Sequence, residues 1–380
     1  MKKNVIVRAG IEDGIGFITG FPLTGTAGAI MTEVILPWIK GRGTPKFLDW
    51  ELKAWPHIYS EVQNLLEIKV NSENYRIPQQ VIFDNTVKQI PVDGVCIEKV
   101  PNRYALDTAI KVRTNKAFGL YLKMLVNMKR KYHNDLNLRL TAMSEDDNKL
   151  SLSVQDVFYE DYIRTNLVLD YEYGEGGSTL RKLIHADKIL DPLNSTPLAN
   201  NFGVNILIFT IDGKLIIQKR SKNVVVRPNE YCPSASGTIS SLDIPRSKVK
   251  LSEVPLMREA VEELGFPNYD VSNTYLLGIT RELIRGGEPE LFLAAKSGYS
   301  FDQLVLAHQH ADDKFESHSI SFFDFDKYAC DERLDSYDKI AHFINLVDKF
   351  IAQYKSHMSI PLWTAIALWK KARLQNVNIY

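Results

Sequence analysis

Residues 256–266, LMREAVEELGF, constrain the fold of this chain more than any other segment. At about 100° per residue, a helix here gathers its apolar side chains on one face, namely Met257, Ala260, Val261 and Leu264. The opposite face presents one guanidinium group and three carboxylates, from Arg258, Glu259, Glu262 and Glu263. Gly265 follows as a left-handed C-terminal stop. The apolar face has to be covered, and we expect it to pack on a β-sheet.

The three carboxylates on one helix face call for a counter-charge. Like charges three or four residues apart repel by about 0.2–0.5 kcal/mol per pair, and Arg258 alone offsets them. A divalent cation removes the conflict, because hard Mg²⁺ or Mn²⁺ ions prefer carboxylate oxygens. We therefore predict a metal site on this face, with a solvated acidic helix as the alternative.

The runs on both sides of this helix have the alternating or β-branched character of strands. Three hairpins and one further strand are expected, at residues 136–159, 204–219, 275–296 and 318–326. The second hairpin turns at Asp212-Gly213, a strong hairpin signal. Further helices are expected at 116–132, after Ser178 as a cap, at 335–355 and at 359–374, with Pro361 in the first turn of the last. This order of elements indicates the α+β class.

The chain is long enough for more than one domain. Residues 174–201 begin with a glycine cluster and end rich in Pro and Asn, which is typical of a connecting region. We therefore expect an N-terminal α+β domain of unknown role over residues 1–195, and a second domain over 196–380 that includes the terminal helices. Those helices could cap their own domain or form the contact of a homodimer.

Charge and cysteine usage narrow the class of protein. Lys+Arg and Asp+Glu both number 46, so no overall basic field exists to bind nucleic acid or a membrane surface. The three cysteines are far apart, which argues against a disulfide framework and fits a reducing, cytoplasmic location. Residues 14–32 carry no charge but are rich in Gly and Thr, so we expect a buried, turn-rich segment rather than a membrane span.

REAVEELGF resembles the second half of the Nudix box, G-x5-E-x7-R-E-U-x-E-E-x-G-U, where U is bulky and apolar. The hairpins before and after it also follow the order of elements in that fold, and the resemblance covers about residues 200–330. YEDYIRTN, at 159–166, is similar to a segment upstream of the box in some longer Nudix proteins. The resemblance implies an α/β/α sandwich with a mixed sheet.

The first half of the box departs from the family pattern. Gly237 lies five intervening residues before Asp243, which gives G-x5-D with an aspartate in place of glutamate. Fourteen residues then separate Asp243 from Arg258, where the family has seven. We interpret the difference as an insertion of seven residues, IPRSKVK (244–250) or nearby; the alternative is that this half of the box has decayed.

The resemblance implies metal-dependent hydrolysis of the pyrophosphate bond in a nucleoside diphosphate joined to a second group. Glu262 and Glu263 would bind Mg²⁺ or Mn²⁺, with Glu259 as a further ligand or as the base for water. Gly237 would add its carbonyl oxygen, and Arg258 would orient the glutamates. The alternative is a Nudix-like module that binds a nucleotide derivative without cleaving it.

Residues outside the box would determine specificity. Arg220 and Arg227 could hold phosphate, Asp243 could reach the substrate, and Glu316 could serve as an extra base. His308 and His310 are expected to be solvated loop residues. Isopentenyl-diphosphate isomerases share the Nudix fold and use a cysteine ahead of the box, but we expect Cys232 to be a buried strand residue.

Overall fold

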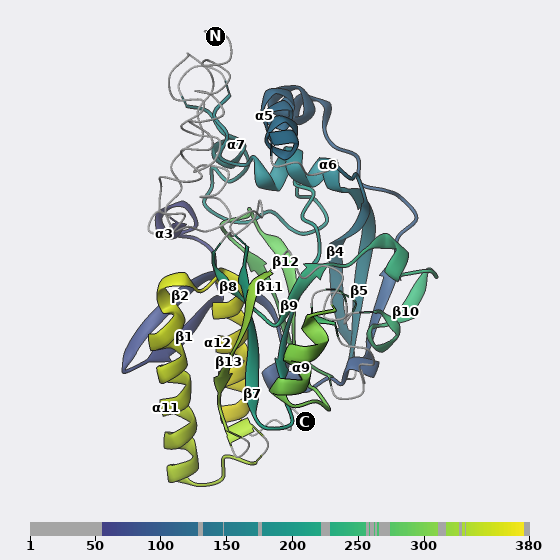
Figure 1. The fold of residues 1–380 in the computed structure, drawn as a ribbon. Coiled ribbons are helices and arrows are strands. Elements are labelled where there is room, and N and C mark those ends of the chain that lie inside the picture. Colours follow the sequence, from purple (N-terminus) through teal and green to yellow (C-terminus); the bar gives the residue numbers. More distant parts are fainter. Residues whose placement is uncertain are drawn as a thin grey trace, which may run out of the picture.

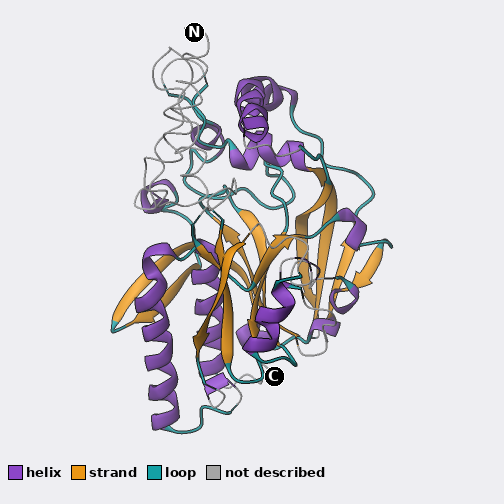
Figure 2. Cartoon of the chain, in the orientation of Figure 1, coloured by secondary structure: helices purple, strands orange, loops and turns teal. Residues whose placement is uncertain are grey.

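The structure is a computed structural model that describes most of the chain from residue 55 to residue 375. The described residues are 55–127, 132–146, 148–173, 177–221, 229–255, 258, 262, 264–265, 274–310, 317–326, 329–330 and 332–375. They form two mixed sheets and flanking helices, so the protein belongs to the α+β class (Figures 1 and 2).

A large mixed sheet forms the centre of the described part of the chain. Its main order is β1-β2-β11-β12-β6-β7-β13, and β8 and β9 pair with β7 and β6. The strands are β1 (Leu65–Val70), β2 (Glu73–Asp84), β6 (Gly203–Phe209), β7 (Lys214–Arg220), β8 (Tyr231–Cys232), β9 (Ala235–Thr238), β11 (Thr274–Glu282), β12 (Glu288–Lys296) and β13 (Ser317–Asp324). β12 and β6 are parallel, whereas the neighbouring pairs β11–β12 and β6–β7 are antiparallel hairpins.

A smaller sheet has the order β10-β3-β5-β4. Its strands are β3 (Val95–Lys99), β4 (Leu136–Asp146), β5 (Lys149–Phe158) and β10 (Lys248–Lys250). β4 and β5 form the hairpin expected from the sequence, and β3 pairs with β5 in parallel. β10 lies at the outer edge of this sheet in Figure 1.

The helices differ in length and position. They are α3 (Trp55–Ile58), α4 (Asn85–Lys88), α5 (Thr108–Asn127), α6 (Tyr159–Tyr162), α7 (Leu180–Ile184), α9 (Phe301–His308), α11 (Tyr337–Tyr354) and α12 (Ile360–Leu374). A π-helical turn (Ile163–Leu167) follows α6, and short 3-10 turns lie at Val92–Gly94, Ser241–Asp243, Leu251–Glu253 and Lys355–His357. Ser359 caps α12 and Pro361 lies in its first turn, as predicted. Thr179, and not Ser178, caps α7, while α5 begins eight residues before the helix predicted at 116.

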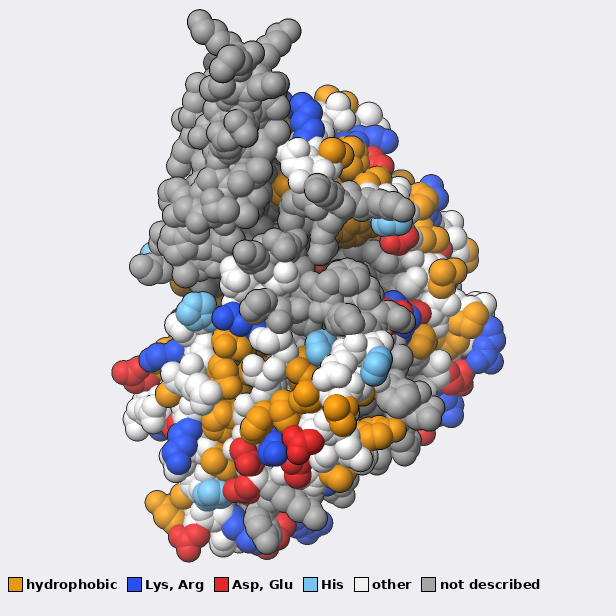
Figure 3. All heavy atoms as spheres, viewed as in Figure 1, with side chains coloured by type: hydrophobic (Ala, Val, Ile, Leu, Met, Phe, Trp, Pro, Cys, Tyr) orange, Lys and Arg blue, Asp and Glu red, His pale blue; other side chains and the backbone are white. Residues whose placement is uncertain are grey.

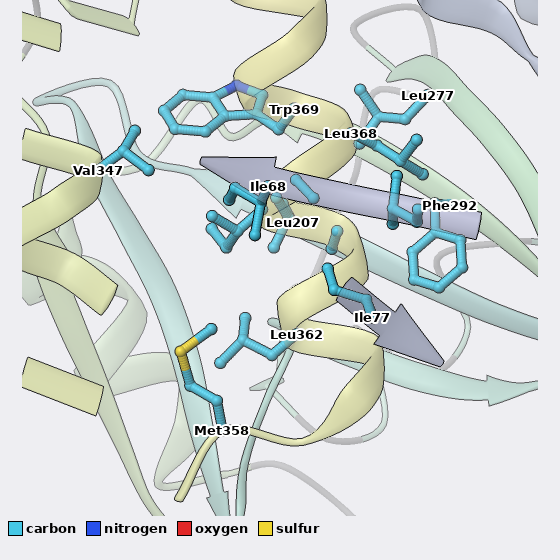
Figure 4. Packing of buried hydrophobic residues seen from close by; sticks show 14 of the residues in the cluster. Ile68, Ile77, Leu207, Leu277, Phe292, Val347, Met358, Leu362, Leu368 and Trp369 are labelled. Atoms are coloured by element: carbon cyan, nitrogen blue, oxygen red, sulfur yellow. The ribbon is translucent and has the colours of Figure 1, made fainter. Parts of the chain in front are cut away.

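Each face of the large sheet has its own core. On one face α11 and α12 pack, and Trp369 of α12 stacks on Phe209 with ring centroids 4.7 Å apart. Figure 4 shows Leu362, Leu368 and Trp369 of α12 beside strand residues. The second core lies on the opposite face, where apolar side chains of the large sheet, such as Ile206, meet those of the small sheet, such as Ile97 and Leu152. The large sheet is therefore sandwiched between helices and the small sheet.

A domain boundary was expected at residue 195, and strands from both sides of it share both sheets. β2 pairs with β11 in the large sheet, and β10 pairs with β3 in the small one. Such pairing joins segments that are far apart in sequence, so composition near residue 195 gives no sign of it. No described helix is long and apolar enough to cross a membrane, and residues 14–32 lie outside the described part of the chain.

Candidate functional site

Gly237 lies in β9, opposite Val204 of β6. Beyond β9 the chain crosses to the small sheet, where the backbone N–H of Leu138 donates to the carbonyl of Ile239. A 3-10 turn, Ser241–Asp243, follows at once. The turn that carries Asp243 is therefore attached to both sheets.

Asp243 is held by a capping box at this turn. Its Oδ2 accepts the backbone N–H of Ser240 at 2.8 Å, and the Ser240 hydroxyl in turn accepts the N–H of Leu242 at 3.2 Å. The other oxygen, Oδ1, lies 3.6 Å from Nε of Arg258, and the side chain is only 10% exposed. Both carboxylate oxygens of Asp243 therefore face groups of its own chain.

Arg258 connects Asp243 to the acidic helix. Its Nη1 lies 3.1 Å from Oε2 of Glu262, one helical turn further on. The side chains of Arg258 and Glu262 are 35% and 33% exposed. We call Asp243, Arg258 and Glu262 the box corner. It brings the two halves of the box together across the fourteen residues between Asp243 and Arg258.

The helix predicted at 256–264 is present at each of its described residues. Residues 258, 262 and 264 are helical, and Leu264 is buried in the core between the sheets. Gly265 has φ +75°, and a Cβ there would collide with the carbonyl of Ala307 in α9. Glycine is therefore required at this stop, both for its backbone angle and for its close contact with α9.

The remaining candidates have mixed outcomes. Four of them, Arg227, Glu259, Glu263 and Glu316, lie outside the described residues. Arg220 is half-buried at the end of β7, where its backbone N–H donates to the carbonyl of Glu230. His308 ends α9 and is half-buried, while His310 is exposed just beyond it. Cys232 is buried in β8, as predicted.

Glu290 is a buried carboxylate near Gly237 that the sequence reasoning missed. One of its oxygens accepts a hydrogen bond from Gln79 Nε2 at 2.6 Å, and Thr280 donates to that same glutamine at 2.7 Å. A Cβ on Gly203 would lie 3.4 Å from Cγ of Glu290 and 3.8 Å from the carbonyl oxygen of Gly237. Both groups therefore lie beside Gly203 at this end of the sheet.

Tyr162 and Asn166 of the YEDYIRTN segment pack against the turn between β11 and β12. Tyr162 donates to Glu288 at 2.8 Å, and Arg285 forms hydrogen bonds with both of these residues. Asn166 donates to the carbonyl of Arg285 at 2.7 Å and to Oδ1 of Asn200 at 2.6 Å. Burial raises the pKa of Tyr162 well above its ordinary value, so the phenol stays a hydrogen-bond donor. We call these five residues the turn cluster.

A second buried network lies next to this turn. Arg181 binds both oxygens of Asp170, at 2.6 and 2.7 Å, and donates to Tyr59 and to two backbone carbonyls of the turn. Tyr59 also forms a hydrogen bond with Nδ1 of His185 at 3.0 Å. Burial, with help from Arg181 and Arg281, lowers the pKa of His185 to about 3, so the imidazole is neutral.

Within the box corner, the carboxylate of Glu262 has an oxygen of the kind that hard cations prefer as a ligand. Arg258 pairs with Oε2 of Glu262, while Oε1 of Glu262 forms no hydrogen bond or ion pair within the described part of the chain. The described residues contain no group of three or more His, Cys, Asp or Glu side chains placed to hold a metal ion. The other predicted ligands on the helix, Glu259 and Glu263, lie outside those residues.

Comparison with known proteins adds little to this geometry. No family model and no curated protein matches the chain. The crystal structure of DR0079 from Deinococcus radiodurans is similar to part of it, at 17% sequence identity and a TM-score of 0.23, and covers 33% of this chain and 67% of that chain. At this TM-score the likeness is too weak to assign a fold or a function.

Proposed function

We propose that this protein is a metal-dependent hydrolase that cleaves the pyrophosphate bond of a nucleoside diphosphate linked to another group. The observation that supports the proposal most is the box corner. Asp243 comes from the first half of the box and Glu262 from the second. Both lie beside Arg258, although fourteen residues separate Asp243 from Arg258.

Each candidate ligand or supporting residue has its own role in this proposal. Arg258 fixes Glu262 through Oε2 and leaves Oε1 available to a cation. Helical spacing puts Glu259 and Glu263 on the same face, and the Gly237 carbonyl would add a neutral oxygen. A bound Mg²⁺ or Mn²⁺ would polarise the phosphoryl group and lower the pKa of bound water.

Asp243 acts in this proposal as a support for Arg258 and not as a substrate ligand. Its two oxygens face Ser240 and Arg258, and its side chain is nearly buried. An aspartate can therefore replace the glutamate of the family pattern, because its task is to hold one guanidinium group.

Binding of a nucleotide derivative without turnover is the second candidate function. It is favoured by the shortened acid at 243 and by the extra residues in the loop before the helix. The two functions share a metal site and differ in turnover, so one set of assays separates them.

The test is a substrate screen with Mg²⁺ or Mn²⁺ that covers ADP-ribose, dinucleotides, nucleotide sugars and nucleoside triphosphates. We expect the wild-type protein to release phosphate or a nucleotide from at least one class, and Glu262→Gln to lose that release. Glu253→Gln is the matched control, since Glu253 also pairs with an arginine, Arg246, but lies outside the corner. Release that survives in Glu262→Gln contradicts the hydrolase; tight binding without release supports the sensor.

A further inference from the structure

Three of the extra residues between the two halves of the box form a strand. Residues 248–250 are β10, which pairs with β3 in register Lys248–Glu98, Val249–Ile97 and Lys250–Cys96. Ile244, Val249 and Leu251 are buried in the core between the sheets. The insertion is thus anchored to a part of the chain about 150 residues earlier.

Lys99, the last residue of β3, contacts both the turn Ser241–Asp243 and the insertion that follows it. Its Nζ donates to the hydroxyl of Ser241 at 2.6 Å, and its backbone N–H donates to the carbonyl of Ser247 at 2.7 Å. The ammonium group also lies 2.7 Å from Oδ1 of Asp156 in β5, and both side chains are 23% exposed. Lys99 therefore ties the turn that carries Asp243 to two strands of the small sheet.

We propose that Lys99 is a positioning residue for the box corner. Through Ser241 it fixes the turn Ser241–Asp243, and Asp243 then holds Arg258 and Glu262. This inference rests on the proposed function for its effect on turnover, but the positioning itself can be measured without any substrate. It also gives the small sheet a role, because β3 and β5 support the site from outside the box.

Other ion pairs near the insertion do not provide the same support. Lys248 pairs with Glu98, and Arg246 pairs with Glu253, but all four side chains are exposed. Exposed pairs contribute little because solvent screens them and long side chains lose entropy when they are held. The side chain of Lys99 is less exposed to solvent than these four, and its two side-chain partners lie in a strand and in a turn.

The first experiment follows amide hydrogen exchange in Lys99→Met. We expect peptides that span residues 239–265 to exchange about tenfold faster, because the turn loses its tie to β3, while peptides from α11 and α12 keep their wild-type rates. Lys248→Met is the matched control and leaves residues 239–265 unchanged, since its pair is exposed. Wild-type exchange in Lys99→Met would overturn the proposal.

The second experiment uses the substrate found by the screen. We expect Lys99→Met and Ser241→Ala each to lower kcat about tenfold with little change in KM. The double variant should be no worse than Lys99→Met, because both substitutions remove the same hydrogen bond between Lys99 and Ser241. Additive losses would overturn the proposal. A wild-type protein without turnover would contradict the proposed hydrolase, and the exchange result would still decide whether Lys99 positions the corner.

Discussion

The Arg258–Glu262 pair of the box corner and the Arg181–Asp170 pair are built from the same chemical groups and differ in exposure. In the corner, the side chains of Arg258 and Glu262 are about one-third exposed. Arg181 and Asp170 are 3% and 10% exposed, and the arginine also binds backbone carbonyls of the β11–β12 turn. A carboxylate that water can reach can also be reached by a cation or a substrate. A carboxylate that is buried beneath a turn, as Asp170 is, has a structural role.

The two regions should therefore respond oppositely to substitution. Loss of a partner in the buried pair leaves an uncompensated charge, which costs far more than the loss of an exposed pair. Loss of a partner in the corner should leave stability almost unchanged and alter activity. Basic and acidic side chains are interspersed over the described part of the face in Figure 3, which is consistent with weak electrostatic interactions at the surface.

The largest effect on the free energy of unfolding is expected for Asp170→Asn. It leaves Arg181 buried with its carboxylate partner removed, and we expect a loss of about 3–5 kcal/mol. Urea unfolding measures it. Glu67→Gln, which breaks the exposed pair with Arg76 at 2.9 Å, is the control and should cost less than about 1 kcal/mol. Equal losses would contradict the contrast between the two regions.

The stability of the protein should depend on pH through the protonation of His185. Its pKa falls from 6.5 in the unfolded chain to about 3 in the fold, so below pH 6.5 the unfolded state binds more protons. Stability should then decline as pH falls from 6.5 towards 3, with a contribution of about 1.4 kcal/mol per pH unit from this group. Urea midpoints between pH 7 and pH 4.5 measure the decline. His185→Asn should reduce the slope, and an unchanged slope in this variant would contradict the assignment to His185.

Tyr162→Phe is expected to have a smaller effect. The change removes the hydroxyl that donates to Glu288 in the turn cluster, and the buried carboxylate loses a donor at a cost of about 1–3 kcal/mol. Tyr75→Phe removes a similar hydrogen bond, to Glu73 at 2.7 Å, but on the surface. Thermal unfolding of both variants should rank Tyr162→Phe as the more destabilised, and the reverse order would show that the turn cluster is not structural.

The smallest effect on stability is expected for Asp243→Asn. Its pair with Arg258 is long, 3.6 Å, and partly exposed, so we expect a loss below about 1 kcal/mol. Turnover should nevertheless fall about tenfold, because Arg258 no longer holds Glu262 as firmly. Asp335→Asn breaks an exposed pair with Lys339 and should alter neither property. Unchanged turnover in Asp243→Asn would remove Asp243 from the site.

Local sequence patterns predicted the local parts of this structure. Alternating or β-rich runs located the hairpins β4–β5, β6–β7 and β11–β12, and the glycine signal at 265 matched a left-handed residue. Pairing between distant segments was missed, because β2 with β11 and Lys99 with Ser241 leave no local trace. Glu288 and Glu290 could have been found, since both are acidic residues within the first three positions of a strand that continues with the apolar run LFLAA.

Mn²⁺ binding, followed by electron paramagnetic resonance, tests most directly whether the box corner is a metal site. It needs no knowledge of the substrate. We predict that the wild-type protein binds Mn²⁺, that Glu262→Gln weakens this binding by at least about tenfold, and that Glu253→Gln leaves it unchanged. Equal Mn²⁺ affinity in the wild type and in Glu262→Gln would contradict the assignment.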